Sequence, residues 1–522
     1  MYDYVIVGAG SAGCVLAGRL SEDPTCEVAL LEAGGSDRTN GVRIPAAFTS
    51  LFKTERDWNF TTTPQSELHD REMYWPRGKM LGGSSSMNAQ MWIRGHRDDY
   101  DAWAEQGAEG WAWSDLEPLF RRVERRSQGG VFGTDGPLWI EDLRDPNPTT
   151  AAFLEGCAEI GLERLPSLNE ADNTGFAPMA VTQHRGRRWS AADGYLRPAR
   201  KRKNLTVLTD VLVDRVLWDG QRAMGVEYVD GKGERQQART DREVLLSGGS
   251  LGSPVVLARS GVGPVDDLRA LGIEPVAESP SVGANLQDHL VLAVIRECPE
   301  PVSMITAESP RSLVRYLLFR KGMLSSNVGE AAAFVRTLPS LTAPDIELIF
   351  APVPYQDHGQ VEPTGHGTTI GVVLLQPESR GWLRLVSTDP AEPPAIDAGY
   401  LTKPADLEAL VRGVRAAQRI YESDAMAPYR GDPVEPDAGV VTDEDVADFA
   451  REQAETLYHP SGTCRMGSDD DAVVDPELRV RGVDRLRVVD ASVMPSLNRG
   501  HTHAPTVVIA ERAAELITGG SR

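Results

Sequence analysis

Cysteine is scarce in this sequence, and long apolar runs are missing. The 522 residues include five cysteines (Cys14, Cys26, Cys157, Cys298 and Cys464), widely spaced and without a Cys-x-x-Cys pair. This pattern excludes a zinc or disulfide framework and predicts free thiols in a reducing compartment. No run of about 18 apolar residues occurs, so we expect no membrane-spanning helix. The first residues lack the regions of a signal peptide, and we expect a soluble cytoplasmic protein.

Basic residues are also few. The 54 Lys and Arg stand against 76 Asp and Glu, which gives a formal net charge of −22 and a pI of about 4.9. Affinity for nucleic acids and for anionic membranes comes from Lys and Arg, so this balance argues against both partners. With 41% hydrophobic and 25% charged residues, the chain is neither disordered, nor a collagen, nor a long coiled coil. Its length predicts about two to four structural units.

The first 32 residues carry a nucleotide-binding pattern. Apolar runs at 4–7 and 28–31 flank a helix-like stretch at 12–21, which predicts a strand–turn–helix–strand unit. The turn reads Gly8-Ala9-Gly10-Ser11-Ala12-Gly13. These glycines allow the tight turn, the approach of a pyrophosphate and the packing of helix on strand. Glu32 ends the second strand, where its carboxylate can accept hydrogen bonds from ribose hydroxyls. An acid there disfavours a 2′-phosphate but does not separate NAD from FAD.

Similar elements recur near the other end of the chain. Short strands are expected at 244–246 and 486–489, and helices at 253–258 and 506–517. The stretch between the two ends is rich in proline and alternates strand-like and helix-like pieces, as a separate unit would. The layout predicts a discontinuous Rossmann-like nucleotide domain at 1–297 and 455–522, with a loop-rich segment at about 40–95 and an inserted second domain at 298–454.

Several segments together resemble one family, the glucose–methanol–choline (GMC) FAD-dependent oxidoreductases, and are nearest its choline and alcohol dehydrogenase branch. They occur in the family's order, at 8–34, 78–89, 247–264, 282–289, 458–467 and 489–506. The resemblance implies an α/β fold in which an FAD-binding domain holds an inserted α+β substrate domain built on an antiparallel sheet. It also implies FAD as the cofactor and oxidation of an alcohol.

The resemblance assigns FAD contacts to these segments. The fingerprint supplies Gly8, Gly10, Ser11, Ala12, Gly13, Glu32 and Ala33. A small-residue loop supplies Gly82, Gly83, Ser84 and Ser85, followed by Met87 and Asn88 near the isoalloxazine. Val213 would read the adenine, Asp490 and Ala491 would lie near the ribityl–phosphate region, and His501, Thr502 and Thr506 would lie at the pyrimidine end.

Met87 and the C-terminal helix carry two further expectations about the flavin. Some relatives bind FAD covalently through a histidine at the position of Met87. Methionine cannot form that bond, so FAD should be non-covalent here. The N-terminus of the helix near Thr506 would stabilise negative charge on the reduced flavin. We expect no metal.

Two of the nine histidines carry the predicted chemistry. Alcohol oxidation needs a base for the hydroxyl proton while the carbon-bound hydrogen leaves as hydride, and histidine titrates near the operating pH. By resemblance, His459 is this base, and His501 positions the substrate oxygen over flavin N5. An extended backbone would send His503 to the opposite face from His501. We therefore expect a structural role for His503, with the one-residue ambiguity left open.

Two other functions compete with alcohol oxidation. The run from Gly248 to Gly252 is a Gly-x-Ser-x-Gly, and Asp490 and His501 follow Ser250 in the order of a hydrolase triad. A serine hydrolase, however, leaves the fingerprint and the small-residue loop unused. Within the family, lyases and light-driven decarboxylases keep FAD with little or no net redox turnover, so the fold does not decide the reaction.

The sequence leaves the substrate and the electron acceptor open. The acceptor could be oxygen or a quinone-like carrier, and the alcohol could be choline, a sugar, or an aromatic or aliphatic alcohol. A quaternary ammonium substrate would call for an aromatic cage and a carboxylate. Glu330 and Tyr355 lie in the region that should form the pocket wall, but nothing in the sequence shows that they converge. The oligomeric state is not predicted.

Overall fold

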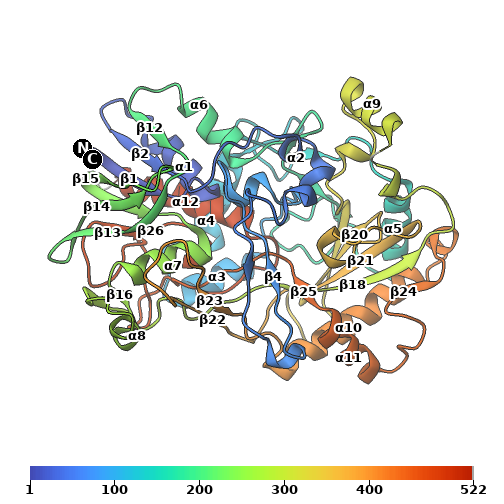
Figure 1. The fold of residues 1–522 in the computed structure, drawn as a ribbon. Helices are drawn as coiled ribbons and strands as arrows, with labels where there is room; N and C mark the ends of the chain where they lie inside the picture. Colours follow the sequence, from blue (N-terminus) through green and yellow to red (C-terminus); the bar gives the residue numbers. More distant parts are fainter. Residues whose placement is uncertain (308, 520–522) are drawn as a thin grey trace.

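Two seven-stranded sheets organise the chain in a computed structural model that describes residues 1–307 and 309–519. The first sheet lies in the half of the molecule that holds both chain ends, and the second lies in the opposite half (Figure 1). The polypeptide passes from one half to the other and returns twice, because residues 175–178 join the second sheet before residues 205–246 join the first.

The first sheet contains the predicted strand–turn–helix–strand unit. Its order is β12-β2-β1-β15-β14-β13, and β26 pairs with β15. Strands β12, β2, β1, β15 and β26 run parallel, while β13 and β14 add an antiparallel extension. Their short runs are apolar because a parallel sheet is covered on both faces. The bounds are β1 Tyr2–Val7, β2 Val28–Leu31, β12 Leu205–Leu208, β13 Leu212–Asp219, β14 Arg222–Val229, β15 Arg235–Leu246 and β26 Leu486–Val488.

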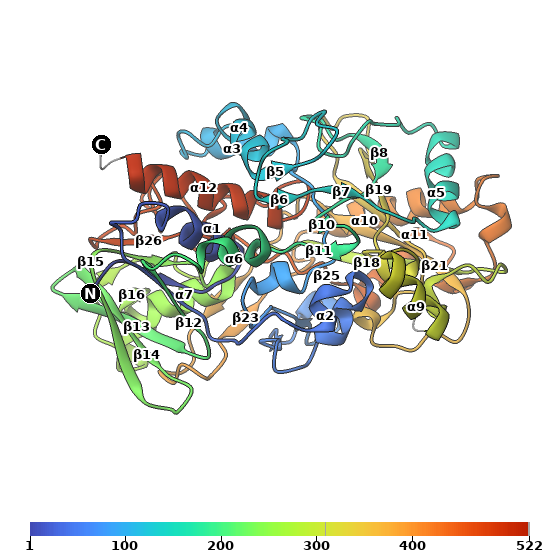
Figure 2. The same ribbon diagram turned by 90° about the horizontal axis from the view of Figure 1, so that it is seen from above.

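Three helices connect this sheet to the cofactor region: α1 (Ser11–Leu20), α7 (Gly249–Arg259) and α12 (His503–Gly519). Helices α1 and α12 pack together although they come from opposite ends of the chain (Figure 2). Helix α12 begins at His503, earlier than the expected start at Thr506, because a proline such as Pro505 is tolerated in the first helical turn. The backbone is thus helical at His503, and the strand-like alternation expected for this residue does not apply.

The second sheet is antiparallel throughout, as expected for the inserted domain. Its order is β24-β18-β21-β20-β19-β8, and β25 pairs with β18. Two of its strands precede residue 298 and one follows residue 454, and the domain limits stay a prediction. The bounds are β8 Gly175–Pro178, β18 Leu290–Glu297, β19 Ala331–Val335, β20 Ile346–Ala351, β21 Gly367–Leu374, β24 Pro433–Glu435 and β25 Glu455–Thr456.

Further helices cover the two sheets. Helices α5 (Pro148–Glu159) and α10 (Pro404–Tyr421) pack on the second sheet, and α11 (Asp443–Gln453) packs on α10. Helices α3 (Arg97–Glu105) and α4 (Trp113–Val123) pack together, and α4 contacts α12. All five cysteines are buried and free. Within the described part of the chain, no helix combines the length and the hydropathy that a bilayer span needs.

A buried ion pair stabilises the segment that supports α12. Arg94 Nε donates to Glu124 Oε1 over 2.9 Å, and both side chains are almost fully buried. The same carboxylate oxygen accepts from Trp92 Nε1 at 2.8 Å. The Trp92 ring in turn meets the His503 ring edge-on, with 5.6 Å between centroids. The ion pair therefore holds Trp92 against the first residue of α12.

Replacing Glu124 should lower the stability of the protein. In Glu124→Gln, the Arg94 guanidinium stays buried without a counter-charge, so we expect the free energy of unfolding to fall by about 3–5 kcal/mol. Urea denaturation followed by tryptophan fluorescence measures the change. The control is Glu117→Gln, which removes a partly exposed ion pair with Arg121 and should cost less than about 1 kcal/mol. Equal effects of the two variants would contradict the expectation.

Candidate active site

A cavity of about 800 Å³ lies between the two sheets. Its wall takes residues from β1, β2 and β13 of the first sheet and from β18, β20 and β21 of the second. The predicted FAD-contacting and catalytic residues all line this cavity except Gly13 and Gly82. Residues that are far apart in the sequence thus form one enclosed surface.

The glycine turn has the geometry that the fingerprint predicts. Gly8 has a φ of 94°, and a side chain there would come within 2.5 Å of the Ser247 carbonyl oxygen. A side chain on Gly13 would meet the Gly8 carbonyl oxygen at 1.8 Å, so this glycine lets α1 pack on the turn. Gly10, in contrast, has open space in front of it and lines the cavity. Its backbone is therefore open to a ligand.

Glu32 fixes the same turn. Its carboxylate accepts from the backbone N–H of Ala9 and of Gly34, each over 2.8 Å. Burial raises the pKa of Glu32 to about 7, against the opposing effect of these hydrogen bonds. Because the residue also lines the cavity, ribose hydroxyls that donate to it would favour the ionised form.

The small-residue loop packs directly on the glycine turn. Gly83 has a φ of 52°, and a side chain there would come within 2.7 Å of Gly10 Cα. The Ser85 hydroxyl donates to the Gly82 carbonyl oxygen over 2.6 Å, and Ser84 Oγ accepts from Gly78 N. Both hydroxyls stabilise the loop, and because the Ser85 O–H is used within it, fewer donors are free for a ligand than the sequence suggests.

Met87 and Asn88 follow this loop. Met87 packs among apolar neighbours that include Phe48 and Phe52. Asn88 Oδ1 accepts from Arg188 Nη1 at 2.7 Å, which fixes the amide at the cavity wall. A methionine in this apolar cluster offers no atom for a covalent bond to flavin.

Asp490 organises the N-terminus of α7 and does not belong to a hydrolase triad. Its carboxylate accepts from Ser253 Oγ at 2.6 Å and from Gly249 N at 2.9 Å. Ser250 Oγ is buried and finds no partner among the described residues, His501 included. The hydrogen bond that a serine nucleophile needs from its histidine is therefore missing, which argues against the hydrolase reading.

The cavity fits a flavin dinucleotide. Besides Ser250 Oγ, the buried atoms Ser247 Oγ and His503 Nε2 lack partners within the described residues, and all three residues line the cavity. Buried polar atoms are normally hydrogen-bonded. Open backbone at Gly10, a carboxylate at Glu32 and these unpaired groups match the pyrophosphate, ribose and ring-edge chemistry of FAD.

His459 lies in a hydrogen-bonded chain that fixes its protons. His289 Nε2 lies 3.1 Å from the Leu375 carbonyl oxygen, which can only accept, so His289 donates from Nε2. Burial lowers the pKa of His289 to about 3, so its Nδ1 carries a lone pair. This Nδ1 lies 2.8 Å from His459 Nδ1. His459 therefore donates from Nδ1 and has a free lone pair on Nε2.

The backbone of His459 is held as firmly as its ring. Its N–H donates to Asp288 Oδ1 over 2.7 Å, and the other oxygen of that carboxylate accepts from Thr456 Oγ1 at 2.6 Å. The preceding residue, Tyr458, has a φ of 68°, a conformation that a non-glycine residue adopts at a cost. Burial lowers the pKa of His459 well below its usual value, and the nearby Arg77 guanidinium acts in the same direction.

His501 meets His459 and is oriented by a buried acid. The two imidazole centroids are 4.9 Å apart. His501 Nε2 donates to the Glu347 carboxylate, at 3.1 and 3.2 Å from its two oxygens. Glu347 is fully buried on β20. His503 also lines the cavity, but its Nδ1 pairs with Ser11 Oγ at 3.1 Å, which places it beside the glycine turn.

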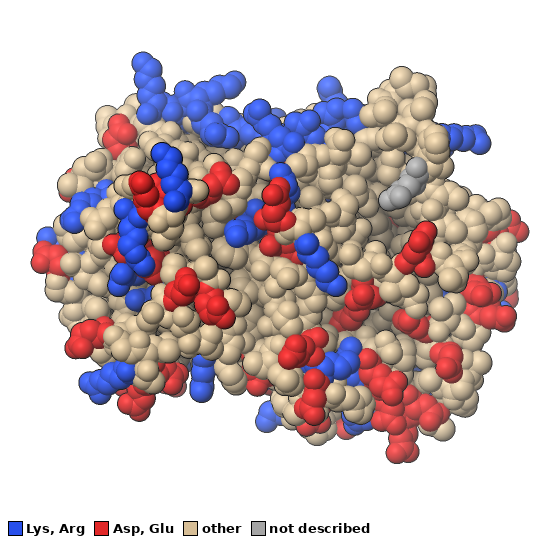
Figure 3. Space-filling model, in the orientation of Figure 1, with Lys and Arg blue, Asp and Glu red and all other residues tan. Residues whose placement is uncertain are grey.

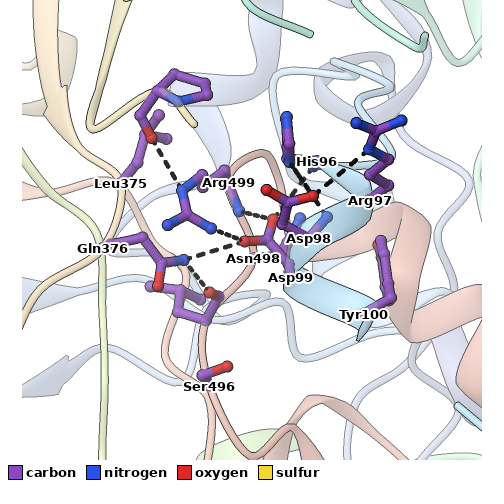
Figure 4. Close-up of polar contacts among 12 residues, drawn as sticks. His96, Arg97, Asp98, Asp99, Tyr100, Leu375, Gln376, Ser496, Asn498 and Arg499 are labelled. Atoms are coloured by element: carbon purple, nitrogen blue, oxygen red, sulfur yellow. Dashed lines mark hydrogen bonds and ion pairs between the residues drawn. The ribbon is translucent and has the colours of Figure 1, made fainter. Parts of the chain in front are cut away.

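The loop that carries His501 is tied to both halves of the molecule (Figure 4). Arg499 donates from its backbone N to Asp99 Oδ2 over 2.6 Å, and its side chain pairs with the same carboxylate. Arg499 Nε donates to the Pro344 carbonyl oxygen at 3.0 Å. Gln376 donates to the Leu497 carbonyl oxygen in the same loop. These contacts connect α3 and the second sheet to the residues just before His501.

Tyr355 and Glu330 differ in their relation to the cavity. Tyr355 lines it, together with Phe52, Glu435 and Glu455. Glu330 does not: it is buried and accepts from Ser326 Oγ, Asn147 N and Thr150 Oγ1 at 2.6–2.7 Å. Glu330 itself therefore lies outside the cavity wall, although Val328 and Gly329 beside it line the cavity, because nearby donors satisfy its carboxylate elsewhere.

Sequence reasoning did not identify His289 and Glu347. His289 ends the segment 282–289, which resembles the family but received no role. Glu347 is the single acid of the strand Ile346–Ala351, and a lone charged residue in an apolar strand is a signal that could have been used. A further candidate group, Asp357, His358 and Glu455, has ligand atoms within 4.8 Å of one another, but His358 Nδ1 pairs with the Tyr458 hydroxyl at 2.7 Å.

Comparison with known proteins agrees with this geometry. The two GMC oxidoreductase models match residues 2–291 and 377–510. An alcohol dehydrogenase (acceptor) of Pseudomonas putida is 41% identical over 527 residues, covering 99% of this chain and 96% of its own. Human mitochondrial choline dehydrogenase is 42% identical over 534 residues, covering 99% and 90%.

A solved structure agrees as well. That of pyridoxine 4-oxidase from Mesorbium loti superposes with a TM-score of 0.92 at 34% identity, covering 99% of both chains. The match therefore extends over the whole fold, both sheets included. Sequence segments, fold and relatives together show that the chain belongs to the GMC oxidoreductase family.

Proposed function

We propose that the protein oxidises the CH–OH group of a small alcohol, with His459 as the base and His501 as the group that holds the substrate oxygen. The observation that carries the proposal is the hydrogen bond between His459 Nδ1 and His289, which leaves His459 Nε2 for a substrate beside His501 in the shared cavity. The relatives named alcohol dehydrogenase and choline dehydrogenase support the same reaction class. FAD, when bound, supplies the hydride acceptor.

His459 and His501 have different roles in the transfer of the hydroxyl proton. His459 takes the hydroxyl proton on Nε2 while Nδ1 stays bonded to His289. The low pKa of His459 keeps this atom unprotonated at neutral pH. The Glu347 carboxylate accepts from His501 Nε2 and leaves Nδ1 to face the substrate oxygen. His501 Nδ1 is then the ring atom available to hydrogen-bond the substrate oxygen as negative charge develops on it.

Removing the base tests the function. In His459→Ala, we expect anaerobic reduction of the flavin by an alcohol to slow by about 100- to 10,000-fold, while the flavin absorbance shows that the cofactor is still bound. Stopped-flow absorbance across a panel of alcohols gives the rate and the preferred substrate. His184→Ala, which removes a histidine outside the cavity wall, should leave the rate unchanged.

Two outcomes would overturn parts of this proposal. Reduction of His459→Ala at the wild-type rate would refute the role of His459. Failure of every alcohol to bleach the wild-type flavin would favour a lyase or decarboxylase. Reoxidation of the reduced enzyme with oxygen or with a quinone-like dye then distinguishes the two classes of acceptor.

His289 should act as a positioning residue for His459. In His289→Leu, His459 Nδ1–H loses its acceptor, the tautomer with the proton on Nε2 becomes competitive, and the rate should fall at least about tenfold. His289→Asn keeps an oxygen that can accept, so it should recover part of the loss.

In the wild type, the pKa of His459 is low, so flavin reduction should stay constant from neutral pH down to below about 6.5 and slow only at more acidic pH. Equal rates and pH profiles in the two variants would refute the positioning role.

Denaturation of the protein should release FAD that is chemically unmodified. Because Met87 offers no atom for a covalent bond, acid precipitation should release FAD into the supernatant, where its absorbance can be measured. A yellow pellet that retains flavin after washing would contradict this expectation and would require a different point of attachment.

A further inference from the structure

Helix α9 (Pro310–Phe319) presents an apolar surface to solvent. Tyr316 is its buried side chain, and the helix projects from the half that holds the second sheet (Figure 1). A contiguous exposed apolar surface on a folded protein usually marks a binding site. The side chains that it exposes, by 41 to 69%, are Leu313, Val314, Leu317, Leu318 and Phe319.

The spacing of the first four of these residues gives the helix one apolar face, whereas Phe319 lies on the other side of the last turn. At 3.6 residues per turn, Leu313 and Leu317 lie one above the other, as do Val314 and Leu318, and the two rows are adjacent. Arg311 and Arg315 follow at the edge of this face. An exposed apolar face bordered by arginine is typical of a helix that lies in the surface of a membrane.

Basic side chains surround the base of the helix. The Tyr316 hydroxyl donates to the Gly186 carbonyl oxygen over 3.1 Å, which ties α9 to the hairpin of β10 (Gln183–His184) and β11 (Arg187–Arg188). The sequence from 309 to 329 contains no acid. Arg315 pairs with Asp145 at 2.6 Å. The basic rim, as we define it, is Arg144, Arg185, Arg187, Arg311, Arg320 and Lys321, of which Arg320 is half-buried and the others are exposed.

The basic character continues along one edge of the molecule. Figure 3 shows Lys and Arg gathered along the upper edge, where α6 (Arg197–Ala199) and α9 lie in Figure 1, and acids gathered at the lower right. Exposed Arg200, Lys201 and Lys203 follow α6. A chain with a net charge of −22 thus has one face on which positive charge prevails.

We propose that this face docks on an anionic phospholipid bilayer, with the apolar face of α9 among the lipid chains near the headgroups and the basic rim against the phosphates. Charge selects this occupant over a second copy of the chain. A symmetric dimer through α9 would bring two basic rims together, whereas anionic lipid complements them. The proposal departs, for this face alone, from the expectation that the net charge disfavours anionic membranes.

Vesicle binding tests the proposal on the FAD-loaded enzyme. We expect co-sedimentation with phosphatidylcholine vesicles that contain about one-third phosphatidylglycerol, and much weaker binding to pure phosphatidylcholine or at high salt. Arg311→Gln/Lys321→Gln should weaken binding about thirtyfold, given about 1 kcal/mol for each basic residue near the surface. Leu317→Glu/Leu318→Glu should also abolish most of it, because the apolar face is lost.

Matched controls keep the test specific. Val441→Glu places an acid on another exposed apolar residue, and Lys232→Gln/Arg239→Gln removes two exposed basic residues near β14 and β15. Both should bind vesicles like the wild type, and every variant should keep the wild-type rate of flavin reduction in solution.

Equal binding to neutral and anionic vesicles, or binding that survives the α9 changes, would overturn the proposal. A dimer in light scattering that only the α9 variants dissociate, without vesicle binding, would assign the face to a second copy.

Discussion

The parallel pairing of β26 with β15 is the interaction on which the rest of the structure depends. Because β26 completes the first sheet only after the chain has built the second, the polypeptide must cross between the sheets and return. The last outgoing crossing, near Gln287, and the last returning crossing, near Ser461, exchange backbone hydrogen bonds of 3.1 and 2.9 Å. These antiparallel segments place His289 beside His459, 170 residues away in the sequence. The histidine pair is therefore a consequence of the topology.

The same crossing explains why the histidines are neutral. Both sheets exclude water from the junction, so the charged imidazole is disfavoured at His289 and His459. A buried imidazole still needs partners for its N–H groups. The Leu375 carbonyl oxygen is the terminal acceptor of this chain of hydrogen bonds. Because it can only accept, it sets which nitrogen of His289, and then of His459, carries the proton. Backbone geometry on the second sheet thereby determines which nitrogen faces the cavity.

Local patterns in the sequence predicted what depends on local chemistry. The glycine turn, β1, β2 and α1 follow from spacing and apolar runs, and the signature segments located His459 and His501. The partners of these histidines could not be found in the same way. Glu330 and Glu347 are both lone acids beside apolar strands, yet local donors satisfy one and the other meets His501 across 154 residues. Only the three-dimensional pairing of the strands shows which of the two acids reaches the active site. The loop before α12 likewise depends on a distant partner, because Arg499 N donates to Asp99 across 400 residues.

The net charge of the whole chain does not describe how charge is distributed over its surface. Interactions between surface charges are screened beyond about 10 Å in salt solution, so a membrane responds to the side chains that approach it and hardly to acids on the opposite side. On the face shown in Figure 3, acids gather at the lower right, away from the edge where α9 lies. Helix α9 packs on Met323–Ser325, which contacts the segment Pro45–Leu51. Phe48 of that segment lines the cavity. The basic face is thus joined to one cavity-lining residue only through two intervening segments, so changes on its outer surface leave the active site intact.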